Sequence, residues 1–253
     1  MSEFWTFALV GFLAQIVDGS LGMGFGIISS SVLLAQGVPP ALASASVNAA
    51  KIPTTFTAAA SHFVHKNLTR DILIALCIFG GLGGFLGAVL LTSLKGKLLA
   101  NMINVYLVLV GGLIIYRGLR DIVPHSLPRY FPGFVGFAGG LIEGIGGSWG
   151  PIVTTGLMGG GVPSRYAIGS TNIAEFVVSI TVFLSFVGAF LTGHWQGGAD
   201  WKQTFLPVAG LVIGGLPAAL AGGWLSKIAP RRELTIVVGM LAVGIAVFRY
   251  LSA

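Results

Sequence analysis

The chain has 253 residues, of which 55% are hydrophobic and only 9% are charged. Soluble domains average about 25% charged residues, so this chain has too few charges to cover a surface that faces water, and a soluble domain is excluded. The formal net charge of +6 does not indicate nucleic-acid binding, because the lysines and arginines are scattered over short segments and form no basic run with interleaved aromatic residues.

Glycines interrupt the first apolar segment of the chain. Residues 4–17 are apolar, residues 18–26 read Asp-Gly-Ser-Leu-Gly-Met-Gly-Phe-Gly, and residues 27–36 are apolar again. A helix rises about 1.5 Å per residue, so neither apolar piece alone crosses about 30 Å of hydrocarbon. We expect either a re-entrant hairpin over residues 4–36, with its glycine-rich tip in mid-membrane, or one broken spanning helix.

The rest of the chain repeats this plan. Apolar runs long enough to span follow at residues 41–64, 72–94 and 98–116. After a proline-containing linker at 121–132, a second interrupted segment covers 131–157, with its interruption at 143–150. Further apolar runs lie at 166–190, 205–225 and 234–250. Spanning segments without barrel periodicity are helices, because hydrocarbon offers no partner for backbone polar groups. The predicted fold is therefore an all-α integral membrane protein with one repeat at 1–120 and another at 131–253.

Short matches at a nearly constant spacing support a duplication. Asp18-Gly19 returns as Glu143-Gly144, 125 residues later. Gly37-Val38-Pro39 returns as Gly161-Val162-Pro163, 124 residues later, and the pair Ser46 and Asn48 returns as Ser170 and Asn172 at the same spacing. Because these matches occur in the same order in both halves, we interpret the two halves as structural repeats.

The distribution of positive charges favours hairpins over broken spans. With one crossing per interrupted segment, the two sides of the membrane carry 6 and 7 lysines and arginines, whereas hairpins give 9 and 4, an asymmetry typical of membrane proteins. The larger group is Lys66, Arg70, Arg117, Arg120, Arg129, Arg165, Lys227, Arg231 and Arg232, and the smaller is Lys95, Lys97, Lys202 and Arg249. Each half then crosses an odd number of times, so the prediction is two inverted repeats, a plan found in secondary transporters, with both termini outside.

The glycine-rich tips suit an anion. A helix that starts after such a tip exposes backbone N–H groups and partial positive charge, and nearby hydroxyl and amide groups add donors. The alternative is that these glycines only permit close helix packing. The residues expected to contact a substrate are Ser20, Leu21, Gly22, Met23, Gly24, Asn48, Lys51, Gly146, Gly147, Ser148, Trp149, Ser170 and Asn172.

Ionisable residues inside the apolar segments are candidates for function. Lys51 has Glu175 as its counterpart 124 residues later. This swap of sign predicts either a structural ion pair between the halves or a lysine that is the counter-charge of an anionic substrate. Asp18, Glu143 and Glu175 are the candidates for carrying a coupled proton.

Other classes of function find no support in the sequence. We find no H-E-x-x-H, G-x-S-x-G or G-x-x-x-x-G-K-[ST] motif, so we expect no enzymatic activity and no ATP-driven transport. His62 and His65 are spaced for one helix face but have no further ligand types nearby. We therefore expect no metal and no cofactor.

The chain resembles the TauE/SafE family of sulfite and organosulfonate exporters. The resemblance lies in the two halves, in the tips with Asp18-Gly19 and Glu143-Gly144, and in the two Gly-Val-Pro motifs. The resemblance implies a multi-pass protein of the inner membrane that exports sulfite, sulfoacetate or a related sulfonate by alternating access. We expect transport to be coupled to protons, and the energy to come from an ion gradient, the membrane potential or the gradient of the substrate itself. An uncoupled anion channel or uniporter, a permease for another small organic anion, and a structural membrane protein are the alternatives, and a homodimer is a further expectation.

Overall fold

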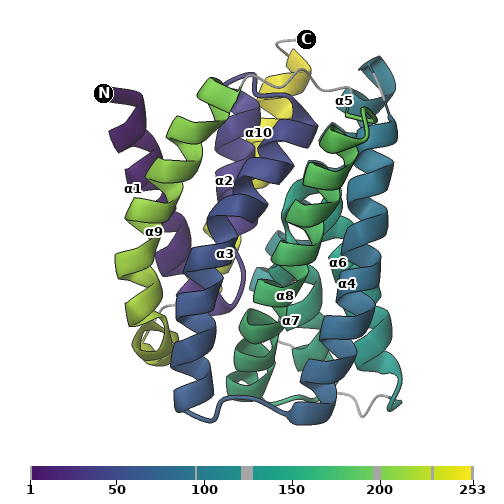
Figure 1. Cartoon of the computed structure of the whole chain (residues 1–253). Coiled ribbons are helices and arrows are strands. Elements are labelled where there is room, and N and C mark those ends of the chain that lie inside the picture. Colours follow the sequence, from purple (N-terminus) through teal and green to yellow (C-terminus); the bar gives the residue numbers. More distant parts are fainter. Residues whose placement is uncertain (1, 95, 121–127, 196–200, 229–230, 252–253) are drawn as a thin grey trace.

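The computed structural model describes residues 2–94, 96–120, 128–195, 201–228 and 231–251, and all regular secondary structure within them is helical (Figure 1). The prediction of an all-α fold is confirmed. The helices are α1 (Ser2–Leu21), α2 (Phe25–Ala35), α3 (Pro40–Val64), α4 (Arg70–Ser93), α5 (Gly96–Leu119), α6 (Phe131–Gly146), α7 (Trp149–Gly159), α8 (Ser164–Leu191), α9 (Trp201–Ile228) and α10 (Arg231–Leu251).

The outside of the molecule is apolar and its centre is polar. On α4, Ile78, Leu82 and Phe85 are each about half exposed, and α4 and α8 are among the three helices in the described part of the chain that are long and apolar enough to cross a membrane. By contrast, the buried side chains include Lys51 and Glu143. An exposed apolar surface of this extent is typical of contact with lipid, so the protein is a membrane protein.

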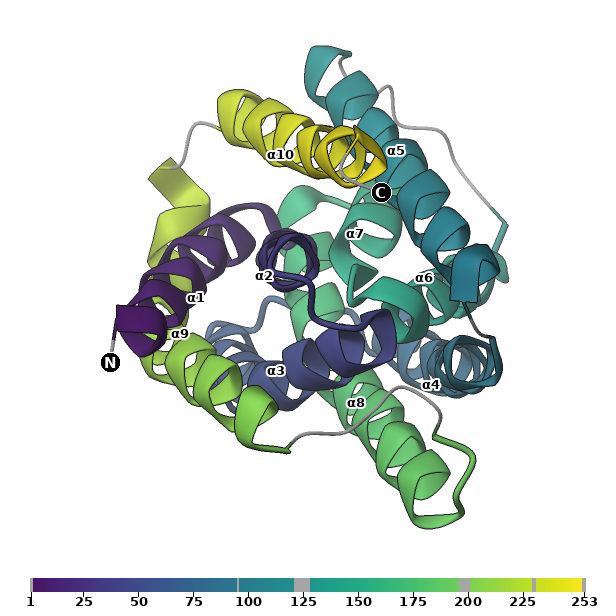
Figure 2. The same ribbon diagram turned by 90° about the horizontal axis from the view of Figure 1, so that it is seen from above.

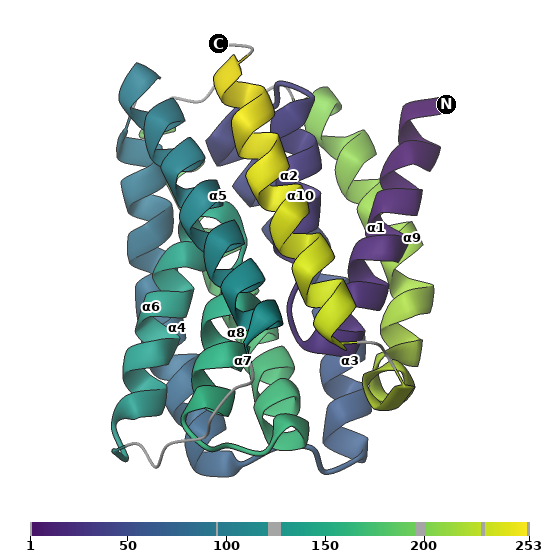
Figure 3. The ribbon, with the colours of Figure 1, turned by 180° about the vertical axis from the view of Figure 1, so that it is seen from behind.

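Two helical hairpins enter the molecule from opposite ends. α1 starts at the end where α10 finishes, and α2 returns to that same end (Figures 1 and 3). α6 starts at the other end and α7 returns there (Figure 3). Viewed along the long axis, α2 and α7 lie near the centre and longer helices surround them (Figure 2). Each interrupted segment is thus a pair of antiparallel helices, α1 with α2 and α6 with α7, joined at a glycine-rich tip.

The breaks are shorter than the sequence suggested. We expected interruptions over 18–26 and 143–150, but only residues 22–24 and 147–148 leave the helices. The backbone needs a positive φ at Gly22 (68°), Gly24 (140°) and Gly147 (72°), and glycine adopts this conformation without strain. The other glycines of both tips stay helical, because their neighbours pack around them and the helical hydrogen bonds continue.

Each hairpin packs on a long helix from the other half of the chain. α1 lies along α9, and α6 lies along α4. Glycines bring these backbones together: a Cβ built on Gly140 would lie 2.0 Å from the carbonyl oxygen of Gly80, and one built on Gly214 would lie 1.8 Å from that of Ala8. Small residues at such crossings are typical of helix packing in membranes. Most of the chain's glycines at these crossings therefore serve packing.

The two Gly-Val-Pro motifs form the same turn. Gly37 and Gly161 both have a φ of 82°, and each turn is closed by a bond from the valine N–H to the carbonyl of Leu33 or Leu157. Glycine at this position ends a helix with a left-handed residue, and the proline of the motif is the N-cap residue of the next helix. The repeated tripeptide therefore positions α3 after α2 and α8 after α7 in the same way.

Candidate functional site

The two hairpin tips touch each other at the centre of the molecule. A Cβ built on Gly26 would lie 1.3 Å from the carbonyl oxygen of Gly147, and one built on Gly150 would lie 2.4 Å from that of Gly22. The hydroxyl of Thr154 in α7 donates a 2.7 Å hydrogen bond to Gly22 O. Only glycine allows backbones to approach this closely, so the tip glycines are required for the contact between the halves.

Lys51 in α3 joins the second tip to α6 and α8. Its Nζ donates to Glu143 Oε1 (2.7 Å) and to Glu175 Oε1 (2.8 Å), and the exposed fractions of the three side chains are 2% or less. A third bond, of 2.8 Å, goes to Gly147 O at the second tip. An ammonium group has three N–H donors, so every donor of Lys51 is occupied. The ion pair that the swap of sign predicted is confirmed, and Glu143 is a second partner.

A carboxylate from the preceding helix caps the helix after each tip. Glu143 Oε2 accepts a 2.6 Å bond from the backbone N–H of Trp149, the first residue of α7. Asp18 Oδ1 accepts a 3.3 Å bond from the N–H of Phe25, the first residue of α2. The positive end of a helix attracts a carboxylate. The first N–H group of each helix, which we expected to face an external anion, is therefore bonded to the protein's own acidic residue.

The matched asparagines have equivalent surroundings. Asn48 Nδ2 donates to Ser44 O (2.9 Å), and Asn172 Nδ2 donates to Ile168 O (3.0 Å). The Oδ1 atoms of both side chains are buried without a partner. Asn48 precedes Lys51 by three residues and Asn172 precedes Glu175 by three, so each amide lies on the same helix face as a charged residue. Both amides thus keep hydrogen-bonding capacity beside the charged cluster.

Several predicted ligands make structural contacts instead of facing an open space. Ser20 donates to Ile16 O (2.6 Å), and Ser170 Oγ accepts from the N–H of Thr69 (3.1 Å). Trp149 is fully buried, and its Nε1 donates to Thr171 O (3.2 Å). The Oγ of Ser148 is 3.5 Å from Gly146 O, a long contact that leaves this hydroxyl weakly bound.

The remaining predicted residues lie in or beside the tips. Leu21 and Met23 are buried, and Gly24 has Val17 directly against it. Gly146 packs against the ring of Tyr106, because a Cβ there would lie 2.4 Å from that ring. Sequence reasoning missed Tyr106 and Thr154. Thr154 corresponds to Ser30 at the spacing of 124 residues, and this shared hydroxyl is the signal that could have identified it.

The buried cluster contains more carboxylates than cations. Asp18, Glu143 and Glu175 surround one ammonium group, that of Lys51, and all four side chains are buried. Asp18 Oδ2 and Glu175 Oε2 have no hydrogen-bond partner. Buried charges without partners are costly, so these two oxygens are the least compensated atoms of the cluster. Among the described residues, no group of three His, Cys, Asp or Glu side chains is placed to hold a metal ion.

A lipid-facing exterior, two opposed hairpins and a buried charged cluster where their tips meet define a membrane transporter. The family described as "Sulfite exporter TauE/SafE" matches residues 7–249, so the chain belongs to the TauE/SafE family. It is similar to the "Probable membrane transporter protein YtnM" of Bacillus subtilis (strain 168), with 32% identity over 94% of this chain and 80% of that protein. It is also similar to a "Probable membrane transporter protein" of Haemophilus influenzae, with 28% identity over 81% of this chain and 79% of that protein. No solved structure matches the chain.

Proposed function

We propose that this protein is a secondary transporter that exports sulfite or a small organosulfonate across the inner membrane, with Lys51 as the counter-charge of the anion. The observation that carries the proposal is the buried ammonium group at the contact between the two tips, in a chain that belongs to a family described as sulfite exporters. A cation enclosed in the interior of a membrane protein is costly unless it is paired. An anionic substrate supplies the same pairing as a carboxylate does.

Substrate binding at Lys51 is an exchange of anions. Because its three N–H donors are bonded to Glu143, Gly147 and Glu175, an oxyanion reaches the ammonium group only by replacing one of these oxygens. Glu175 is the best candidate to leave, since Glu143 also caps α7 through its other oxygen. Asn48 and Asn172, together with the hydroxyl of Ser148, then supply further polar groups to the bound anion.

This exchange links the anion to a proton. When Glu175 leaves Lys51, its carboxylate would lie beside the negative substrate with no cation as partner, and a buried group in that position takes up a proton. Its Oε2 is already without a hydrogen-bond partner. The anion and the proton therefore bind together and cross the membrane in the same direction. Export then runs down the concentration gradient of a substrate made inside the cell.

We propose alternating access between two inverted repeats as the route. The opposed entry of the hairpins supports this (Figure 3), as does the exchanged packing of α1 on α9 and of α6 on α4. Rocking of one half against the other would separate the tips and expose Lys51 first to one side and then to the other. The end of the molecule with Arg117, Arg129 and Arg165 is assigned to the cytoplasm by its excess of positive charge.

The proposal is tested by uptake of labelled sulfite and sulfoacetate into proteoliposomes with an imposed pH gradient. We expect accumulation when the outside is more acidic, because protons that move inward carry the anion with them. Glu175→Gln removes the proton carrier and is expected to retain exchange of labelled for unlabelled anion while losing accumulation. Lys51→Met is expected to lose both. Accumulation driven by an acidic interior would contradict coupling in the same direction.

An uncoupled anion channel or uniporter remains the alternative, together with a permease for another small organic anion. A channel gives flux of the anion that never exceeds equilibrium with its own electrochemical gradient, whatever the pH gradient. The saturated bonding of Lys51 argues against a permanently open path, because the tips must separate before an anion can pass. Competition of unlabelled organic anions with labelled sulfite identifies the preferred substrate.

A further inference from the structure

A cavity of about 270 Å³ lies between the first tip, the C-terminal parts of α5 and α7, and the N-terminal end of α10. Its buried floor includes Leu21 and Met23, which belong to the tip, and Thr155 of α7. Arg117, which is half-buried, and the exposed Arg120 and Arg232 line its outer part. A water molecule occupies about 30 Å³, so the cavity has room for an anion of a few heavy atoms with part of its hydration shell.

The charge of this cavity has one sign. Three of its lining residues, Arg117, Arg120 and Arg232, carry a guanidinium group, and none of its lining residues is acidic. No carboxylate in the described part of the chain forms an ion pair with any of the three, since both ion pairs there belong to Lys51. Arginine presents a planar fork of N–H donors that fits the oxygens of an oxyanion. Guanidinium groups around one cavity, paired with no carboxylate of the described residues, thus favour an oxyanion as its occupant.

The cavity adjoins the contact between the tips through Met23. A Cβ built on Gly150 would lie 2.5 Å from the Cα of Met23, so Met23 touches the second tip on one side and lines the cavity on the other. The guanidinium of Arg117 also reaches α7, where its Nη1 would lie 3.4 Å from a Cβ on Gly159. The cavity is therefore next to the elements that would have to separate during transport.

We propose that this cavity is a collecting site that binds the oxyanion at the cytoplasmic end before it reaches Lys51. The inference rests on the function proposed above and adds a second anion site with its own residues, Arg117, Arg120 and Arg232. A cleft lined by charges of one sign raises the local concentration of an oppositely charged ligand and its rate of binding. Met23 separates the collecting site from the tip contact and would move aside when the halves rock.

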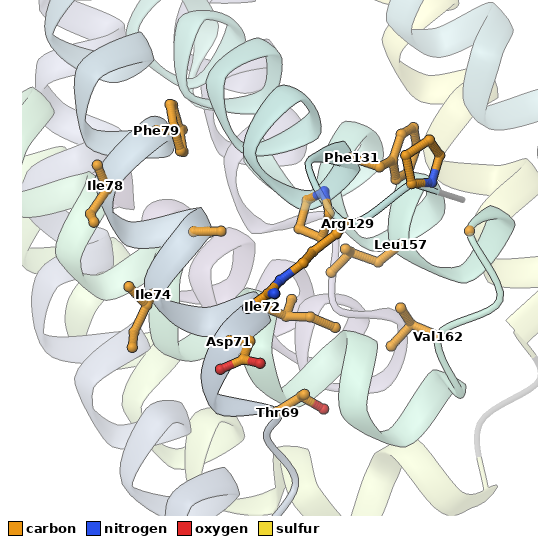
Figure 4. A pocket seen from close by; sticks show the side chains of 14 residues that line it. Thr69, Asp71, Ile72, Ile74, Ile78, Phe79, Arg129, Phe131, Leu157 and Val162 are labelled. Carbon is orange, nitrogen blue, oxygen red and sulfur yellow. The ribbon is translucent and has the colours of Figure 1, made fainter. Parts of the chain in front are cut away.

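The larger cavity at the same end is a weaker candidate for this role. It has a volume of about 570 Å³ and lies between α4 and α6, with mainly apolar side chains such as Ile74, Ile78 and Phe79 around it (Figure 4). Arg129 and Asp71 both line it, so their charges offset each other and give no net preference for an anion. None of its lining residues belongs to either tip.

The test is the dependence of sulfite transport on ionic strength in vesicles of phosphatidylcholine. In the double variant Arg117→Gln/Arg232→Gln, we expect KM at low salt to rise by about tenfold, while the maximal rate stays within about a factor of two. Added salt should raise KM of the unmodified protein and change that of the double variant much less. Arg129→Gln, which changes an arginine at the same end outside this cavity, is the matched control and should behave like the unmodified protein.

Two results would overturn the collecting site. One is an unchanged KM and salt dependence in the double variant. The other is a difference seen only in vesicles that also contain phosphatidylglycerol, which would assign the arginines to lipid headgroups. Binding of inorganic sulfate, followed by thermal stabilisation in detergent, separates this proposal from the transport proposal. Lys51→Met should keep a salt-sensitive stabilisation that the double variant loses, and the reverse pattern would place the only anion site at Lys51.

Discussion

Replacement of Gly26 by alanine should force the two hairpin tips apart. The new Cβ would lie 1.3 Å from Gly147 O, whereas ordinary van der Waals contact begins near 3.4 Å. The backbones must therefore separate by roughly 2 Å at this point. A displacement of that size takes the 2.8 Å bond between Lys51 Nζ and Gly147 O beyond hydrogen-bonding distance. The variant thus loses both the tip contact and one partner of the buried ammonium group.

The size of the effect follows from overpacking. Insertion of one methyl group into a tightly packed core costs about 1–3 kcal/mol, and about 1 kcal/mol lowers the melting temperature of a protein of this size by about 2–4 °C. The melting temperature of the purified protein in detergent and the rate of sulfite exchange in proteoliposomes are the two readouts. We expect Gly26→Ala to lower both.

Gly112→Ala is the matched control. Gly112 lies within α5, and a Cβ built there would meet no heavy atom within 4 Å. Alanine is favoured over glycine inside a helix by about 1 kcal/mol, so this variant should be as stable as the unmodified protein or more so. If Gly26→Ala melts and transports like Gly112→Ala, the tips are not in contact and the arrangement described for Lys51 is wrong.

Three further substitutions test the remaining contacts. Thr154→Val should lower the free energy of unfolding by about 1–3 kcal/mol, because it leaves the buried carbonyl of Gly22 without its donor. Thr154→Ser keeps the hydroxyl and should restore the melting temperature. Equal melting temperatures of the two variants would refute the hydrogen bond. Lys51→Ala should lower the free energy of unfolding by about 3–5 kcal/mol, because it leaves two buried carboxylates without their cation. An unchanged melting temperature of the purified variant would show that Lys51 does not pair with ionised Glu143 and Glu175. Gly37→Ala and Gly161→Ala should each cost about 1–2 kcal/mol through backbone strain, because both residues have a φ of 82°. At Gly37 strain is the only cost, since a Cβ built there meets no heavy atom within 4 Å. A difference of more than about 1 kcal/mol between the two would contradict the equivalence of the turns.

The hydrophobic pattern of the sequence predicts the helices because lipid imposes one length and one polarity on them. α3 and α8 begin and end within a few residues of the apolar runs 41–64 and 166–190. The ion pair between Lys51 and Glu175 was also predictable, because the two residues occupy equivalent positions in the matched segments and carry opposite charges. Local pattern and internal repetition are both properties of the sequence itself, so no tertiary information was needed.

The tips were predicted less well, because glycine is compatible with several backbone conformations. Gly19 and Gly144 read as parts of a break, yet they are helical, since neighbouring helices pack directly against such small residues. No sequence pattern indicated that Asp18 and Glu143 cap the following helices. Capping depends on how sharply the chain turns between each acidic residue and the helix that follows it. These turns are set by the positive φ of Gly22, Gly24 and Gly147.

The cavity lined by Arg117, Arg120 and Arg232 could not be predicted from the sequence, for a different reason. Arg117 and Arg232 were assigned to one side of the membrane by counting charges, but that count says nothing about which of them gather around one space. Their proximity follows from the packing of α5 against α10, a contact between elements far apart in the chain. Long-range packing of this kind leaves no local periodicity to detect.

The most direct test of the account is the pH inside proteoliposomes while a small organosulfonate enters. A sulfonate stays ionised, so it carries no proton of its own across the membrane, and a dye enclosed in the vesicles reports protons that move with it. We expect the interior to become more acidic as the sulfonate enters, and we expect Glu175→Gln to abolish this change while exchange of the sulfonate continues. Entry of the sulfonate with a constant internal pH, or with an interior that becomes more alkaline, would contradict the exchange of anion and carboxylate at Lys51.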